Sequence, residues 1–256
     1  MCRMLTFVTR APATVAQVVT AEALASFTDF SHEHKDGWGI GWRDGNGQIQ
    51  VVRGAGEAWQ EVSYQQTVDA NSSDQLLIHL RKASPGLAVQ LSNCHPFTQE
   101  PLTFCHNGGF HVSEGLRASV AQRGGRPCQG TTDSELYFAL VLLHGRELSW
   151  PDAIFAAVQE ISADVLREVG YLPEALNCFL ITPHATFAYS QYNPDQLKPE
   201  TDRDYYLLQL ARHDGQVVIA SQGWPLPGGE LQPVQRVLQV DRDTLRVSTH
   251  EPVVLG

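Results

Sequence analysis

The sequence opens with the stretch MCRMLTFVT (residues 1–9), in which a cysteine directly precedes an apolar and β-branched run. Such a run is typical of a β-strand, so we expect a strand over Met4–Thr9. Cys2 would then stand at the entrance to the first strand. Taken alone, it fits an unreactive buried cysteine as well as a functional one.

Cys2 would become chemically distinctive if Met1 were removed, a step that is favoured before a small second residue. Its thiol would then lie beside its own α-amine. A free thiol has a pKa of about 8.5 and an α-amine one of about 7.7–8.0, so the amine could accept the thiol proton near neutrality. Cys2 is therefore our candidate nucleophile, and retention of Met1 would remove its base.

The composition fits a globular protein that acts on a small molecule. At 256 residues and 43% hydrophobic, the chain can bury one sizeable core, so we expect a single domain over residues 1–256. A net charge of −10 and a pI near 5.4 argue against binding to nucleic-acid phosphates or anionic lipid. No apolar run approaches the roughly 18 residues of a membrane span, and the start lacks the apolar core of a signal peptide. We therefore expect a cytoplasmic protein with a small-molecule substrate.

The cysteines predict neither a disulfide framework nor a metal site. They are odd in number and widely spaced, in a chain too large to need covalent staples. The pairs Cys94-His95 and Cys105-His106 lack the close ligand spacing that is typical of zinc sites. The glycines of Gly37–Gly41 precede a strand, whereas a dinucleotide-binding turn joins a strand to a helix. We expect no metal and no cofactor.

The remaining pattern predicts an α+β protein with two sheets enclosed by helices. A helical pattern runs through Val15–Phe27, and two stronger helices are expected over Ser134–His144 and Pro151–Val169. A hairpin is predicted around Asp44-Gly45-Asn46-Gly47, and the polar residues 193–204 predict a surface loop. Strands are expected at Ile40–Arg43, Ile49–Arg53, Leu76–Leu80, Leu102–Cys105, Leu176–Thr182, Thr186–Tyr192, Val217–Ala220, Val237–Val240 and Thr244–Val247.

Two short motifs follow predicted strands and could contact a polar substrate. Arg81 could hold a carboxylate through its planar guanidinium, although an arginine at a strand end is usually a solvated surface charge. The side-chain amide of Asn107 and the Gly108 N–H could together form an oxyanion hole. Alone, Asn-Gly-Gly is more often a hairpin turn.

Asp133 lies just before one of the predicted helices. It could serve as an N-cap, as a carboxylate for a substrate ammonium group, or as both. Trp38 and Gly39 belong to a glycine-rich strand entrance that permits close backbone approach and would support the pocket. With the nucleophile, the oxyanion hole and the carboxylate clamp, this set describes hydrolysis of an amide of an α-amino acid.

Six segments of the chain resemble the class II glutamine amidotransferases, specifically their stand-alone members, a group that includes the γ-glutamyl hydrolase of ergothioneine biosynthesis. Their order and spacing agree over residues 1 to about 135. The segments are Met1-Cys2-Arg3, His34-Lys35-Asp36-Gly37-Trp38-Gly39, His79-Leu80-Arg81, Asn93-Cys94-His95-Pro96-Phe97, His106-Asn107-Gly108 and Thr132-Asp133-Ser134-Glu135.

The resemblance implies a four-layer αββα sandwich of two antiparallel sheets, the fold of the N-terminal nucleophile hydrolases. It implies hydrolysis of glutamine or a γ-glutamyl amide through a Cys2 thioester, with Asn107 and Gly108 as the oxyanion hole. Substrate binding falls to Arg81, Ser84, His106 and Asp133, and support of the pocket to Trp38, Gly39, His79 and His95.

Two departures from the family pattern concern the pocket more than the reaction. Lys82 stands where many members carry an aromatic residue, and Ser134 replaces a frequent threonine. Larger relatives carry a synthase domain that receives ammonia, and this length leaves no room for one. Water would be the final acceptor, or a separate synthase partner would use the ammonia; a homo-oligomer is left open.

Two other functions remain open on the sequence. One is an N-terminal nucleophile acylase of the bile-salt or penicillin-V type, although Arg81 and Asp133 favour an amino-acid substrate over such acyl groups. The other is a non-catalytic subunit that keeps the fold for assembly with a synthase.

Overall fold

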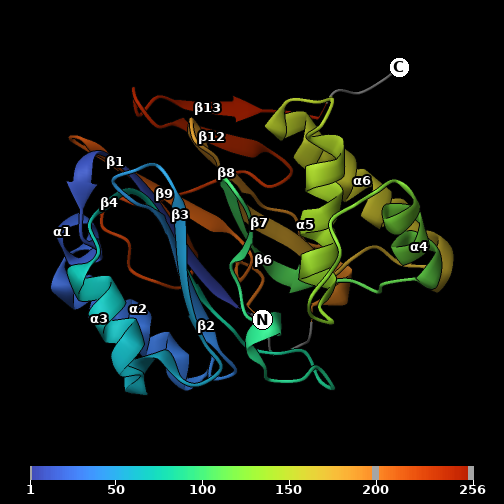
Figure 1. Cartoon of the computed structure of the whole chain (residues 1–256), viewed down its shortest axis with the longest axis horizontal. Coiled ribbons are helices and arrows are strands. Elements are labelled where there is room, and N and C mark those ends of the chain that lie inside the picture. The colour runs from blue at the N-terminus through green and yellow to red at the C-terminus, as the bar shows by residue number, and fades with distance from the viewer. Residues whose placement is uncertain (1, 198–201, 253–256) are drawn as a thin grey trace.

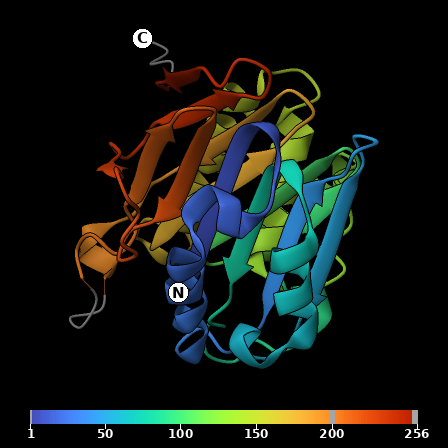
Figure 2. The ribbon, with the colours of Figure 1, turned by 90° about the vertical axis from the view of Figure 1, so that its left-hand side faces the viewer.

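Two antiparallel sheets pack face to face, and helices cover the outer face of each sheet (Figure 1). The computed structural model describes residues 2–197 and 202–252. Viewed from the side in Figure 2, α1, α2 and α3 lie over the strands of the first sheet. The layers follow the order helices, sheet, sheet, helices, which confirms the predicted αββα architecture.

The first sheet has β1 near its middle, so the stretch MCRMLTFVT leads into a central strand. Within the described residues it contains seven strands, and β1 pairs antiparallel with β10 on one side and β4 on the other. In sheet order the strands are β11 (Glu230–Leu231), β9 (Leu208–His213), β10 (Gln216–Ser221), β1 (Arg3–Ala13), β4 (Ser73–Leu80), β2 (Trp38–Arg43) and β3 (Ile49–Gly54).

The second sheet is built around a pair of strands from distant parts of the sequence, β6 and β7. Asn107 on β6 lies opposite Asn177 on β7, and Gly109 lies opposite Ala175. In sheet order the strands are β13 (Val247–His250), β12 (Val237–Asp241), β8 (Ala185–Tyr189), β7 (Ala175–Ile181), β6 (Leu102–Gly109) and β5 (Phe97–Gln99).

The helices divide into two groups, one for each sheet (Figure 1). The first sheet is covered by α1 (Val15–Val19), α2 (Ala21–Asp29) and α3 (Val62–Ala70). The second is covered by α4 (Glu114–Gln122), α5 (Asp133–His144) and α6 (Trp150–Val169). Single 3₁₀ turns occur at η1 (Phe30–His32), η2 (Ala58–Gln60), η3 (Leu91–Asn93) and η4 (Pro194–Gln196).

Strand β1 has two apolar faces, which explains why its sequence shows a continuous apolar run. Side chains alternate along a strand, so Met4 and Val8 enter the core between the sheets, while Leu5 and Phe7 pack under the first group of helices. A strand with one wet face would have alternated apolar and polar residues. The run therefore marks a strand that is covered on both sides.

Three local expectations were wrong. The helical pattern over Val15–Phe27 is split at Thr20, which has φ 72° and caps α2 by accepting a hydrogen bond from the Ala23 N–H. The strand expected at Thr244–Val247 lies later, because Thr244 closes a turn onto the Asp241 carboxylate. The strand expected over Thr186–Tyr192 is shorter, because β8 ends at Tyr189.

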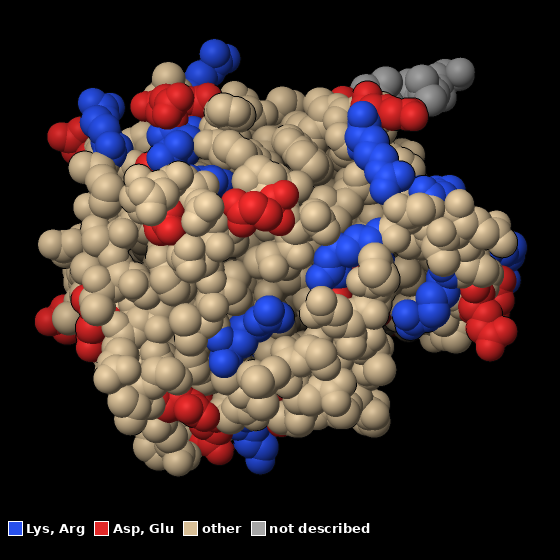
Figure 3. Space-filling view, in the orientation of Figure 1, with Lys and Arg blue, Asp and Glu red and all other residues tan. Residues whose placement is uncertain are grey.

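The predicted hairpin between β2 and β3 is confirmed, with Gly47 at φ 79° in the turn. The predicted surface loop at 193–204 holds η4 and exposed residues, and its positions 198–201 lie outside the described residues. Within residues 2–197 and 202–252, no helix is both long and apolar enough to cross a bilayer. On the face shown in Figure 3, acidic and basic side chains are interspersed over the surface.

Candidate active site

Cys2 lies where the start of β1 meets the end of β6. Its backbone nitrogen donates a hydrogen bond to Asn107 Oδ1 at 2.7 Å, and its Sγ lies 3.8 Å from the Lys82 carbonyl oxygen. Only 8% of the Cys2 surface is exposed, and Asn107 is fully buried. Two predicted site residues that are 105 positions apart in sequence are therefore in direct contact.

The other polar atom of the Asn107 side chain, Nδ2, is buried and has no hydrogen-bond partner among the described residues. Buried donors in folded proteins are rarely left unpaired, because such a donor loses its bonds to water without replacement. The bond from Cys2 to Oδ1 assigns the orientation of the amide and leaves Nδ2 as the free donor. The arrangement can stabilise an oxygen that develops negative charge beside Cys2.

Gly108 has room for no side chain. A Cβ at this position would overlap the Ala175 carbonyl oxygen on the neighbouring strand β7 and approach His106 Nε2. A glycine therefore permits β6 and β7 to pair at the end of the second sheet. The strand end that carries Asn107 is held close to β7 as a result.

Arg81 follows the last residue of β4, and Leu80 in β4 pairs with Arg3 in β1, so Arg81 and Cys2 share one end of the first sheet. Its guanidinium donates to the Asp36 and Ala88 carbonyl oxygens at 3.0 and 3.4 Å. Since a guanidinium has five N–H donors, these bonds fix its orientation and leave others for a ligand. Arg81 can therefore present a fixed fork to a carboxylate.

Asp133 is the first residue of α5 and links this helix to the end of β6. Its Oδ2 accepts from the Phe110 N–H at 2.9 Å, and its Oδ1 accepts from the Ser134 N–H at 2.8 Å. The N-cap role expected for Asp133 was wrong, because Thr132 precedes the helix and its hydroxyl accepts from the Glu135 N–H. Asp133 remains half-buried beside a cavity, where its carboxylate can meet a cation.

His106 is engaged on both sides of its ring. Its Nδ1 lies 2.9 Å from Ser134 Oγ and its Nε2 lies 3.3 Å from the Ala175 carbonyl oxygen. Burial lowers the pKa of the imidazole, against the opposing effect of Asp133. His106 thus connects β6 to α5 and β7, and it is absent from the lining of the two cavities described below.

His79 and His95 form a buried pair behind the site. Their ring centroids are 4.0 Å apart, and His79 Nε2 lies 3.1 Å from the His106 carbonyl oxygen. Burial lowers the pKa of His79 to about 3 and that of His95 well below its ordinary value. Gly39 packs against this pair, since a Cβ there would overlap the His95 carbonyl oxygen. His79 pairs with Met4 in the first sheet, so this group lies close to the start of β1.

Trp38 lies on the other face of the first sheet. Its ring packs edge-to-face on Tyr64 of α3, with centroids 5.2 Å apart, and it belongs to the core under the first group of helices. The structure therefore does not bring the Trp38 side chain together with the other predicted site residues. Trp38 is therefore part of the core between β2 and α3.

Several residues near Cys2 were not found by sequence reasoning. The Tyr205 hydroxyl lies 3.4 Å from the Cys2 carbonyl oxygen and 3.2 Å from His34 Nε2. The Arg3 guanidinium stacks on the Tyr205 ring, 3.9 Å from its centroid. The next residue, Tyr206, donates its hydroxyl to Glu174 Oε1 at 3.1 Å. No short motif marks these residues, because the fold alone brings them together.

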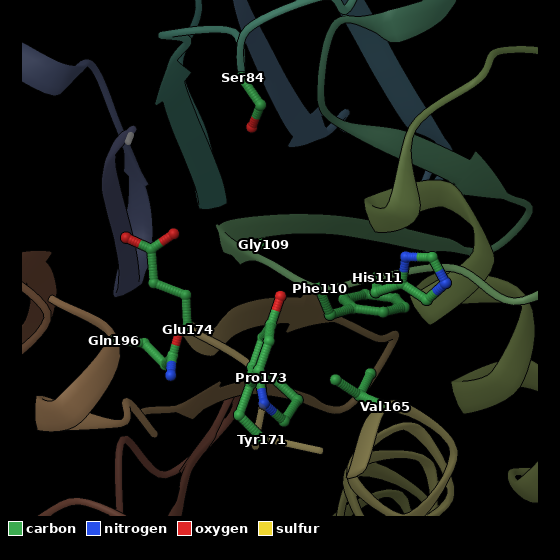
Figure 4. A pocket seen from close by; sticks show the side chains of 9 residues that line it. All are labelled: Ser84, Gly109, Phe110, His111, Val165, Tyr171, Pro173, Glu174 and Gln196. Carbon is green, nitrogen blue, oxygen red and sulfur yellow. The ribbon is translucent and has the colours of Figure 1, made fainter. Parts of the chain in front are cut away.

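Two cavities adjoin the end of β6, each of about 260 Å³. They share Ser84, Gly109 and Phe110 in their linings. One contains Asp133, and the other contains Glu174, which Figure 4 shows together with Ser84. Ser84, predicted to contact substrate, is thus exposed at the border of both cavities.

The chain is similar to several known proteins. The chain is 23% identical to a Saccharomyces cerevisiae protein, Probable glutamine amidotransferase DUG3, over 96% of this chain and 83% of that protein. It is 28% identical to the gamma-glutamyl-hercynylcysteine sulfoxide hydrolase of Mycolicibacterium smegmatis, over 49% of this chain and 50% of that protein.

A solved glutamine aminotransferase class-II domain protein from Silicibacter pomeroyi shares the fold, with a TM-score of 0.69 and 18% identity over 99% of this chain and all of that one. The family described as Glutamine amidotransferases class-II matches residues 1–193. This chain is a member of the class II glutamine amidotransferases, a family of enzymes.

Proposed function

We propose that this enzyme hydrolyses glutamine or another γ-glutamyl amide through a γ-glutamyl thioester on Cys2. The contact between Cys2 and Asn107 carries the proposal, because it holds the backbone of the thiol-bearing residue against a buried amide whose Nδ2 donor has no partner among the described residues. A nucleophile beside an unpaired donor is the arrangement that an acyl-transfer reaction requires.

In the first half of the reaction, the Cys2 thiol gives its proton to the α-amine exposed by removal of Met1, and the thiolate attacks the side-chain amide carbon of the substrate. The carbonyl oxygen becomes an oxyanion that accepts hydrogen bonds from Asn107 Nδ2 and the Gly108 N–H. The carbon–nitrogen bond then breaks, and the α-amine returns the proton to the departing ammonia or amine. Cys2 is left as a thioester.

In the second half, water attacks the thioester carbon and gives a proton to the α-amine. The same two donors hold the second oxyanion. The carbon–sulfur bond then breaks, the α-ammonium group returns its proton to the departing sulfur, and glutamate leaves beside the free thiol. The bond from the Cys2 nitrogen to Asn107 Oδ1 keeps the α-amine and the oxyanion donors in one fixed arrangement throughout.

Arg81 and Asp133 would hold the amino-acid end of the substrate. The guanidinium offers a fork to the α-carboxylate, and the Asp133 carboxylate offers an acceptor to the α-ammonium. The name of the Mycolicibacterium smegmatis relative indicates a γ-glutamyl substrate for that protein, which supports a γ-glutamyl substrate here. The released nitrogen compound would diffuse into solution or pass to a separate synthase.

The first experiment tests the nucleophile. The intact mass of the purified protein, before and after treatment with 6-diazo-5-oxo-norleucine, should show loss of Met1 and one adduct that maps to Cys2. Cys2→Ala should remove both the adduct and glutaminase activity, because no other group in the site replaces the thiol. Cys128→Ala, at a half-buried loop cysteine, serves as the matched control and should keep both.

Turnover by Cys2→Ala close to that of the wild type would exclude a Cys2 thioester. Retained Met1 together with an unlabelled wild-type protein would instead support the non-catalytic subunit.

A further inference from the structure

The cavity that contains Glu174 begins just beyond the proposed oxyanion hole. Gly109, in its lining, lies two residues after Asn107, which is roughly 7 Å along an extended strand. The Glu174 N–H donates to the Gly109 carbonyl oxygen at 3.2 Å, so Glu174 stands directly across from the end of β6. A substituent on the reacting amide nitrogen could therefore reach this cavity.

The Glu174 carboxylate is held at one oxygen and open at the other. Oε1 accepts the hydroxyl of Tyr206, which is fully buried, and no hydrogen bond to Oε2 is formed by the described residues. Oε2 lies 3.9 Å from the place that a Cβ on Gly109 would occupy. Because residue 109 is a glycine, the space between the strand and this oxygen is free of a side chain.

The lining suits an organic cation rather than ammonia alone. Figure 4 shows Glu174 beside Gln196 on one wall and His111 beyond Phe110 on the opposite wall. A volume of about 260 Å³ is several times the roughly 30 Å³ that one water occupies in the liquid. The lining also includes the ring of Tyr171, and carboxylates and aromatic faces both attract cations.

We propose that this cavity binds the amine portion of the substrate, and that Glu174 selects γ-glutamyl amides whose amine portion carries a positive charge. The inference rests on the proposed function, since it assigns the leaving-group side of the same site. Glu174 would act on substrate choice, and the bond-breaking steps would remain with Cys2 and Asn107.

The amino-acid end of the substrate has a separate place. Asp133 lines the adjoining cavity with Thr131 and Leu87, and Glu174 is absent from that lining. Each carboxylate therefore lines its own cavity, although Asp133 Oδ2 and Glu174 Oε2 both lie 3.9 Å from the place that a Cβ on Gly109 would occupy. With Asp133 on the α-ammonium group, Glu174 is left for the other end of the molecule.

The test compares two amides that differ only in charge, γ-glutamyl-(4-aminobutyl)amide and γ-glutamyl-pentylamide, which have the same number of non-hydrogen atoms. The measured quantity is the ratio of their kcat/KM values. The wild type should prefer the cationic amide, and Glu174→Gln should lower the ratio by about 3- to 10-fold, as expected for losing one partly exposed ion pair or charged hydrogen bond. Glu147→Gln, an exposed charge beyond the far end of α5, should leave the ratio unchanged.

Because both amides are measured on one preparation, a general loss of folded enzyme cancels in the ratio. A wild-type ratio near one would overturn the inference, as would a Glu174→Gln effect of equal size on both amides, which would place Glu174 at the amino-acid end. Hydrolysis of glutamine but of neither amide would also overturn it, since the cavity would then exclude amine substituents. If glutamine too were left intact and 6-diazo-5-oxo-norleucine did not label Cys2, the proposed function itself would fail.

Discussion

The two sheets contribute different kinds of group to the candidate site. The first sheet brings Cys2 and Arg81, whose reactive or charged atoms already contact backbone carbonyl oxygens of their own surroundings. The second sheet brings Asn107, whose buried Nδ2 has no partner within residues 2–197 and 202–252, and the glycine backbone that follows it. The groups from the first sheet are held by contacts within the protein, whereas the second sheet offers a donor that a ligand can use.

This difference suggests a division of labour at the meeting of the strand ends. Groups from the first sheet are set before substrate arrives, so they are suited to holding the ground state and supplying the nucleophile. The free donor of the second sheet gains its partner only when an oxygen occupies the place beside Cys2. Substitutions in the two sheets should therefore affect different kinetic constants.

The largest effect in this comparison is expected from Asn107→Ala. Loss of one oxyanion donor typically lowers kcat by about 10²- to 10³-fold, and KM should change little, because the oxyanion exists only past the ground state. Steady-state glutaminase kinetics measure both constants. Asn107→Asp keeps an acceptor for the Cys2 nitrogen but replaces the donor with a carboxylate oxygen, whose charge repels the oxyanion, so kcat should fall at least as far. If either variant changed KM alone, the second sheet would be binding the ground state.

Much of the fold could be predicted, because the periodic sequence of a long segment is enough to indicate its secondary structure. Helices α5 and α6 carry broad apolar faces and capping residues, and both were predicted to within one residue at their start. Helix α3 was missed because only Tyr64, Thr67 and Val68 among its nine residues are buried, which leaves a weak apolar stripe. Strand β9 was missed as well, since no short sequence motif indicates its pairing with β10.

The site divides in the same way. Cys2, Arg81 and Asn107 stand at strand ends, where short motifs point to them, and the fold brings them to one region. Glu174 and Tyr205 lie in segments without a recognisable motif. The pairing of β6 with β7 brings Glu174 to the site, and Tyr205 contacts Cys2, which is about 200 positions earlier in the sequence. Site residues within a short motif can therefore be predicted from the sequence. Site residues that only tertiary contacts bring to the site cannot.

An intermediate effect is expected from Arg81→Ala, which tests the first sheet. Loss of a charged hydrogen bond to the substrate carboxylate should raise KM for glutamine by roughly 10-fold or more, with a smaller change in kcat. Arg81→Lys keeps the charge but not the planar fork, so it should fall between the wild type and Arg81→Ala. Because Arg81 also bonds to Asp36 and Ala88, thermal unfolding should be followed in parallel.

A fall in kcat with KM unchanged would contradict this role, since it would place Arg81 with the groups that act in the transition state. The proposed division of roles, with ground-state binding in the first sheet and transition-state stabilisation in the second, would then be wrong.

The smallest effect is expected on stability, from the buried histidines that join the two sheets behind the site. His79 of the first sheet contacts His95 and the His106 carbonyl oxygen, and burial lowers its pKa to about 3. In the unfolded chain a histidine has a pKa of about 6.5, so between these values the unfolded state binds the extra proton. The free energy of unfolding should therefore fall as the pH drops below about 6.5, by about 2 kcal/mol for such a histidine between pH 7 and pH 5.

Urea unfolding at pH 7 and pH 5 measures this loss. His79→Gln should destabilise the protein at both values yet lose less between them, because the group that titrates is gone. His184→Gln, in an exposed turn, should keep the wild-type difference. If His79→Gln lost as much stability between pH 7 and pH 5 as the wild type, other groups would cause the acid sensitivity. The contact of His79 with the second sheet would then contribute packing alone and nothing to the pH dependence.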